Sequence, residues 1–110
     1  MISSKKELLI YETTAGKTPF EEWLDDLKDR KARAIIRTKL DRLEYGNAGK
    51  YEPVGNGVYE LKIHFGAGYR VYFGEDGKTL IVLIWGGDKS TQERDIQKAK
   101  DYWTDYRTRK

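Results

Sequence analysis

The fold is decided by one stretch of the chain, VYELKIHFGAGYRVYF at residues 58–73. On both sides of a Gly66-Ala67-Gly68 turn, apolar residues alternate with polar ones, and this period of two is typical of β-strands with one buried face. We therefore predict a hairpin with one face in the core and the other face polar. The apolar set is Tyr59, Leu61, Ile63, Phe65, Tyr69, Val71 and Phe73, and the polar set is Glu60, Lys62, His64, Arg70 and Tyr72.

Further strands are predicted on either side of this hairpin in the sequence. Glu75-Asp76-Gly77 is a hairpin turn signal. The nearly continuous apolar run from Thr79 to Trp85, ended by Gly86-Gly87, is typical of a strand that is covered on both faces. Residues 6–13 are rich in β-compatible side chains and lead into a turn at residues 14–17, so they predict an opening strand.

Two helices are predicted between the opening strand and the hairpin. Thr18 with Glu21 forms a capping box for a helix that begins at Pro19. Asp29 is the expected cap of a second helix, which stops at Gly46. Their apolar stripes cannot be buried against each other alone, so we expect a helical hairpin that lies on the sheet.

The remaining segments complete an α+β domain over residues 1–110. Residues 47–57 are rich in glycine and predict a loop. Ser90 with Glu93 forms a capping box for a last helix. The predicted order is β-α-α-β-β-β-α, with a mostly antiparallel sheet, and a chain of 110 residues is long enough for one such domain and one core.

Composition limits the chemistry and the compartment. The chain has no cysteine, which excludes disulfides, thiolate zinc sites and cysteine nucleophiles. No apolar run approaches the roughly 20 residues that span a bilayer, and residues 1–6 lack the apolar stretch of a signal peptide. We therefore expect a cytoplasmic protein.

Charge is distributed unevenly over the two predicted helices of the helical hairpin. Residues 19–29 hold five acids and one base, a net of −4, whereas residues 30–44 hold six bases and two acids, a net of +4. Two solvent-exposed helix faces that pair with each other would account for this pattern. The alternative is that the basic segment steers RNA or an acidic partner.

The polar set of the hairpin is the best candidate for a functional site. If the alternation holds, its members share one face of two neighbouring strands, and Lys89, just past the third strand, could reach that face. Cations interleaved with aromatic residues are suited to gripping phosphates and stacking on bases. The alternative is that one face of an antiparallel sheet is often simply exposed to water.

The residues allow only a few ways of cutting a phosphodiester. With one histidine, no cysteine and no carboxylates at metal-ligand spacing, neither a metal site nor a two-histidine acid–base pair is supported, so we expect no metal and no cofactor. Attack by the 2′-hydroxyl of RNA on its own phosphate remains. Arg70 suits charge stabilisation. Lys62 can serve as the base if neighbouring cations lower its pKa, and His64 can serve without that help.

The β-hairpin at residues 58–73, together with WGGDKSTQ at residues 85–92, resembles the HigB-like "addiction module killer protein" (phage Gp49-like) branch of the RelE/ParE toxin superfamily. The similarity runs from FEEWL at residues 20–24 through DIQKA at 95–99 to Tyr102-Trp103. It implies a RelE-like fold and an endoribonuclease that cleaves mRNA, usually in the ribosomal A site. It also implies a cognate antitoxin of the helix-turn-helix, HigA-like kind.

The resemblance implies three residues that act on the scissile phosphate, namely Lys62, Arg70 and Lys89. Lys89 would hold the phosphate or protonate the leaving oxygen. Tyr69 and Tyr72 are candidates for stacking on a base, and Tyr102 is a third candidate for binding RNA. Relatives also use a residue near the C-terminus, for which this chain offers Tyr102, Tyr106 and Arg107. A departure is Glu60, which stands where related toxins often carry a base and which we expect to pair with Lys62.

Other functions fit the same sequence. The fold also supports ParE-like inhibition of DNA gyrase without nuclease activity, and a non-catalytic RNA-binding regulator could use the same basic face. Lys62, Arg70 and Lys89 favour the nuclease. For the antitoxin, we expect contact with the helical hairpin at least in part, with Arg33 and Arg37 as the residues to test.

Overall fold

A computed structural model describes residues 5–110 of the chain. Residues 1–4, part of the segment on which the signal-peptide prediction rests, lie outside the described residues. The five strands form one sheet in the order β1-β5-β4-β3-β2, in which β1 is parallel to β5 and all other neighbours are antiparallel. The elements are β1 (Glu7–Ile10), α1 (Pro19–Asp26), α2 (Arg30–Glu44), β2 (Glu52–Gly55), β3 (Val58–Ile63), β4 (Tyr69–Asp76), β5 (Leu80–Gly87), a 3-10 turn (Lys89–Thr91) and α3 (Gln92–Arg109). The predicted α+β class with a mostly antiparallel sheet is confirmed.

One strand was not predicted. Within the expected loop, β2 pairs antiparallel with β3 at the edge of the sheet, with Glu52 opposite Glu60. Pro53 is tolerated there because an edge strand needs hydrogen bonds on one side only. Asn56, at φ +57°, and Gly57, at φ +86°, make the tight turn into β3.

The helix starts are partly as predicted. Helix α1 begins at Pro19, and the Asp29 side chain accepts a hydrogen bond from the Ala32 backbone N at the start of α2. Both capping boxes are wrong: the Thr18 side chain makes no capping hydrogen bond, and α3 begins only after the 3-10 turn. That turn is capped by Asp88, whose carboxylate accepts from the Ser90 backbone N at 2.8 Å.

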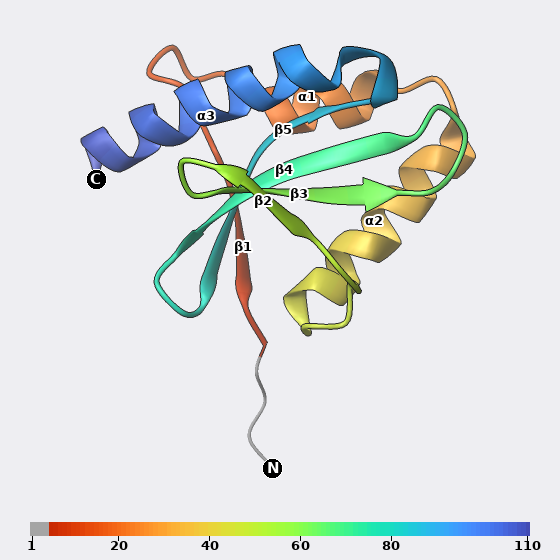
Figure 1. Cartoon of the computed structure of the whole chain (residues 1–110), viewed down its shortest axis with the longest axis horizontal. Coiled ribbons are helices and arrows are strands. Elements are labelled where there is room, and N and C mark those ends of the chain that lie inside the picture. The colour runs from red at the N-terminus through yellow and green to blue at the C-terminus, as the bar shows by residue number, and fades with distance from the viewer. Residues whose placement is uncertain (1–4) are drawn as a thin grey trace.

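Helices cover both faces of the strongly twisted sheet, whose strands fan out from a nearly vertical β1 to a nearly horizontal β3 and β4 in Figure 1. The predicted alternation holds, and on one face Leu61, Ile63, Val71 and Phe73 pack with side chains of α1 and α2. On the other face, Val58, Tyr72, Val82 and Ile84 pack with Ala99 and Trp103 of α3. The second face is therefore not the exposed polar face that the alternation predicted, because α3 buries most of it.

Strand β5 has the position that its apolar run predicted. Its side chains enter the core on both faces, with Leu83 on the α1–α2 side and Val82 on the α3 side.

Within residues 5–110, no helix combines the length and the apolar character that crossing a bilayer requires.

Candidate functional site

The candidate catalytic residues meet in one pocket at the ends of β3 and β4. Lys62 and Arg70 are direct cross-strand partners, and Arg70 lies opposite Gly87 at the end of β5, just before Lys89. The pocket has a volume of about 480 Å³. Its ten lining residues are Lys62, Ile63, His64, Phe65, Gly66, Ala67, Gly68, Tyr69, Arg70 and Lys89, none of which is acidic.

Lys89 is placed by close packing of the two glycines that precede its turn. A Cβ on Gly86 would lie 2.1 Å from the Trp23 ring of α1, and one on Gly87 would lie 1.8 Å from Asp95 of α3. Both positions therefore favour glycine, because a side chain at Gly86 would displace the Trp23 ring and one at Gly87 would displace the buried Asp95 carboxylate. Gly86-Gly87 was predicted as the end of a strand. The same two glycines also let α1 and α3 approach the last residues of β5 from the two faces of the sheet.

Asp95 fixes the start of α3 beside this turn. Its carboxylate is 1% exposed and accepts hydrogen bonds from Trp85 Nε1, at 2.9 Å, and from Thr91 Oγ1. A buried carboxylate held by two side-chain donors ties the end of β5 to the first turn of α3. The backbone around Lys89 is consequently anchored at both ends.

Arg70 is buried and is held on the side of the α3 core. Its Nη1 donates to the Gly68 carbonyl oxygen at 2.9 Å, and its Nε lies 3.5 Å from Oε2 of Glu60. Arg70 is 8% exposed and Glu60 is 4% exposed. Within residues 5–110, the buried Nε has no hydrogen-bond partner and makes only this ion-pair contact, so the guanidinium keeps donor capacity for a ligand phosphate.

Glu60 forms the centre of a buried network behind Arg70. Its Oε2 accepts from the Tyr72 hydroxyl and from Gln92 Nε2, both at 2.9 Å. Burial, with the hydrogen bond to Glu60, raises the pKa of Tyr72 above its ordinary value, so its hydroxyl stays protonated and continues to donate. The predicted pairing of Glu60 with Lys62 is wrong, because the carboxylate turns to Arg70 instead.

Lys62 and His64 are more accessible than Arg70. Lys62 is half-buried and forms no ion pair within the described residues, and His64 is exposed where β3 leads into the turn. Both line the pocket. Each is therefore available to a substrate, as a base or a phosphate ligand requires.

The three candidate RNA-binding tyrosines separate. Tyr69 is half-buried, lines the pocket and packs edge-on against Trp23 at 6.3 Å between ring centroids. Tyr72 is fully buried under α3 and cannot stack on a base. Tyr102 packs in the α3 layer, with its ring 5.1 Å from that of Tyr11, and does not line the pocket.

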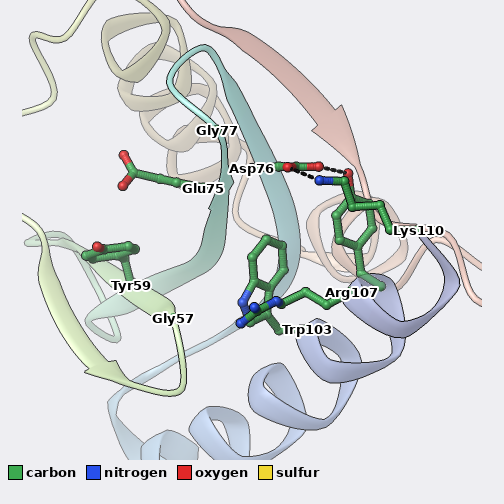
Figure 2. A pocket seen from close by; sticks show the side chains of 9 residues that line it. Gly57, Tyr59, Glu75, Asp76, Gly77, Trp103, Arg107 and Lys110 are labelled. Carbon is green, nitrogen blue, oxygen red and sulfur yellow. Dashed lines mark hydrogen bonds and ion pairs between the residues drawn. The ribbon is translucent and has the colours of Figure 1, made fainter.

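The other two C-terminal candidates lie at a different hollow, of about 780 Å³. It is formed by the start of β3, the end of β4 and the end of α3 (Figure 2). Tyr106 and Arg107 line it, together with Asp76 and Lys110. Asp76 accepts hydrogen bonds from Lys110 and from the Tyr106 hydroxyl, and these hold its pKa below the ordinary value. Two acidic residues, Glu75 and Asp76, line this hollow, whereas no acidic residue lines the Lys62 pocket, so this hollow is less suited to a phosphate.

Three residues that support the pocket from the α3 side were not predicted in that role: Glu60 as the partner of Arg70, Gln92 and Asp95. The sequence did contain a pattern that indicates a helix over this face of the sheet. The stripe of Ile96, Ala99 and Trp103 on the last helix needs a sheet face to cover, and the helical hairpin already occupies the other face.

The helical hairpin partly neutralises its own charges. Arg37 pairs with Asp25 across the two helices at 3.6 Å, and both side chains are exposed. Arg33 Nη1 donates to the Leu27 carbonyl oxygen in the connection between the helices.

Among the described residues, no group of three or more histidine, aspartate and glutamate side chains is placed to hold a metal ion.

Comparison with known proteins gives two matches that cover most of the chain. The family described as "Phage derived protein Gp49-like (DUF891)" matches residues 22–104. An uncharacterized protein of Haemophilus influenzae is 46% identical over 81 residues, which cover 74% of this chain and 82% of that protein. The matched range contains the positions of Lys62, His64, Arg70 and Lys89.

Proposed function

Since the chain belongs to the Gp49-like family of phage-derived proteins, we propose that it is the toxin of a type II toxin–antitoxin system. We propose further that it is a metal-independent endoribonuclease of RelE-like type, which cuts mRNA on the ribosome. The observation that carries the nuclease is the pocket in which Lys62, His64, Arg70 and Lys89 converge without an acidic lining residue. Such a pocket attracts a phosphodiester and opposes the negative charge that develops during its cleavage.

In the proposed reaction, the 2′-hydroxyl oxygen attacks the adjacent phosphorus. Lys62 in its neutral form, or His64, takes the hydroxyl proton, while the bond to the 5′-oxygen of the next nucleotide breaks. Lys89 donates a proton to that leaving oxygen, or it binds the phosphate while a water molecule supplies this proton. The products are a 2′,3′-cyclic phosphate and a 5′-hydroxyl, so protons and electron pairs balance without a metal ion.

Arg70 has the role for which its geometry is best suited. Its guanidinium is anchored through Nη1 and faces Glu60 through Nε, so its orientation is set before substrate arrives. A donor held in advance toward a phosphoryl oxygen stabilises the transition state without reorganisation. Tyr69 lines the pocket, which supports a role in stacking on a neighbouring base.

Primer extension on an mRNA–ribosome complex treated with the purified protein tests this proposal. We expect discrete cuts, and an mRNA with a 2′-deoxynucleotide at a mapped cut should stay intact there because the nucleophile is missing. A block of DNA supercoiling without RNA cuts would instead identify a gyrase inhibitor. Neither effect would leave a binding module without catalysis.

A further inference from the structure

A second hollow adjoins the Lys62 pocket along helix α2, and we call it the α2 groove. It has a volume of about 510 Å³ and shares Ile63, His64 and Phe65 with the pocket. The two hollows therefore adjoin at the end of β3, where these three residues border both of them. The rest of its lining comes from α2: Lys31, Ala34, Ile35, Thr38, Lys39 and Arg42.

The α2 groove uses one flank of the helix. Lys31, Ile35, Lys39 and Arg42 recur at spacings of three and four, which places them in one row along the helix. Arg37 lies on the opposite flank, where it pairs with Asp25 of α1. Helix α2 thus has two separate basic flanks, and only one of them leads to the pocket.

The α2 groove combines a cationic rim with an apolar floor. Its rim carries Lys31, Lys39 and Arg42, and none of its lining residues is acidic. Lys31 Nζ lies 5.7 Å from the ring centroid of Phe65, which is half-buried and contributes to the floor with Ile35. Cations beside apolar and aromatic surface are what a single nucleic-acid strand needs, because its phosphates and its base faces are contacted separately.

The adjacency of the two hollows favours RNA over an acidic protein segment as the occupant. A strand whose phosphate lies among Lys62, Arg70 and Lys89 has to leave the pocket, and the α2 groove borders the pocket at His64 and Phe65. From Lys31 to Arg42 the helix extends about 16 Å, at about 1.5 Å per residue. A strand with the charge spacing of one strand of a duplex, about 3.4 Å, would place about five phosphates over that length, and a more extended strand would place fewer.

We propose that the α2 groove binds the RNA strand that flanks the cut phosphate, with a base on Phe65 and phosphates near Lys31 and Arg42. This inference rests on the proposed function for the position of the cut, but its binding contacts can be measured without cleavage. Arg42 is the residue of choice for the test, because its side chain is exposed and lies far along the groove from the pocket.

The test measures binding of RNA that cannot be cut. Oligonucleotides with a 2′-O-methyl group at the cut site, either two nucleotides long or extended on one side, are titrated by fluorescence anisotropy at several salt concentrations. For the oligonucleotide extended along the groove, Arg42→Ala should lower the salt slope by about 0.7, the value for one phosphate contact to a single strand. It should not change binding of the dinucleotide. Arg37→Ala on the opposite flank is the matched control and should behave like the natural protein.

The outcomes separate this proposal from the nuclease. If the protein cuts mRNA but Arg42→Ala and Arg37→Ala bind extended RNA equally well, the α2 groove is not an RNA site. The same conclusion follows if Arg42→Ala weakens only the complex with the antitoxin, since the groove would then be a protein-docking surface. If extended RNA binds through Arg42 although the protein cuts nothing, the groove stands and the nuclease fails.

Discussion

Arg70 Nε lies 3.5 Å from Glu60 Oε2, with both side chains almost completely buried. The same carboxylate oxygen accepts hydrogen bonds from Tyr72 of β4 and Gln92 of α3. One carboxylate on β3 therefore links the next strand and the covering helix to the cation that we place at the scissile phosphate. The orientation of Arg70 depends on the α3 layer as much as on its own strand.

This relationship changes which Arg70 variant is informative. On an exposed face, Arg70→Ala would remove only function, but here it leaves a buried Glu60 without its cation, which costs about 3–5 kcal/mol in comparable pairs. Arg70→Lys keeps the charge and loses the guanidinium fork. We expect Arg70→Lys to stay folded in thermal unfolding and to lose roughly 100-fold in single-turnover cleavage. Full activity of Arg70→Lys would show that a point charge suffices and that the fork has no role.

Glu60 is predicted to be a positioning residue. Glu60→Gln keeps the shape but removes the negative charge, so we expect about 1.5–3 kcal/mol less stability and roughly 10- to 100-fold lower kcat with unchanged KM. Glu52→Gln, the exposed cross-strand neighbour, should change neither quantity. Val58→Ala supplies a core variant of reduced stability, since Val58 is fully buried under α3. If Val58→Ala lowers kcat as much as Glu60→Gln does, Glu60 acts through stability alone.

Much of the fold could be predicted from local sequence patterns, because those patterns determine local structure. Pro19 and Asp29 mark helix starts through backbone chemistry, and the glycine-containing turns at residues 66–68 and 75–77 separate the strands as expected. Strand β2 was missed because an edge strand of four residues with a proline has no apolar alternation to reveal it. The alternation in β3 and β4 separates two faces but cannot tell which face a later helix covers.

The candidate site was predictable to a similar extent. Lys62, His64, Arg70 and Lys89 line one pocket, as their placement on neighbouring strand ends suggested. The period of two could not predict that Tyr72 is buried or that Glu60 is the partner of Arg70. Both features depend on how α3 packs on the sheet. Their catalytic roles stay predictions, and the variants proposed here test them.

The choice between Lys62 and His64 as the base can be settled by one conservative change. Lys62→Arg keeps the positive charge but cannot accept a proton at neutral pH. We expect cleavage to fall by roughly 100-fold, within the range that general-base catalysis contributes, with RNA binding unchanged. The measurement is the single-turnover rate from pH 6 to 9. Normal rates for Lys62→Arg, with a loss for His64→Gln, would move the base to His64 and leave Lys62 as a phosphate ligand.

Alkaline pH should loosen the contact between α3 and the segment that directly follows β1. Burial, with the hydrogen bond to Asp105, raises the pKa of Tyr11 to about 12 from an unfolded value near 10. Because the folded state holds this proton more tightly, the stabilisation is complete below pH 10 and is lost as pH rises toward 12. The thermal midpoint should therefore fall over this range, and less steeply in Tyr11→Phe. Tyr45→Phe, at a ring 55% exposed, is the control and should follow the natural protein. Equal slopes for all three proteins would show that Tyr11 does not couple folding to pH.

The last prediction concerns the antitoxin and the flank of α2 that the RNA does not use. An inhibitor has to cover the Lys62 pocket or dock elsewhere and keep the toxin off the ribosome, and the α1–α2 hairpin offers a row of acids beside a row of bases for such docking. Arg33 is unsuitable for a charge-reversal test, because Nη1 binds the Leu27 carbonyl oxygen and its loss would disturb the helix connection. Arg37 is suitable, since it is exposed and pairs only with the exposed Asp25 among the described residues. We expect Arg37→Glu to weaken antitoxin binding in a calorimetric titration by about two- to fivefold, as one exposed ion pair would, and to increase toxicity at a fixed antitoxin level. Cleavage of free substrate should not change. An unchanged affinity would exclude Arg37 from the interface and make the pocket face of the sheet the better candidate for the antitoxin.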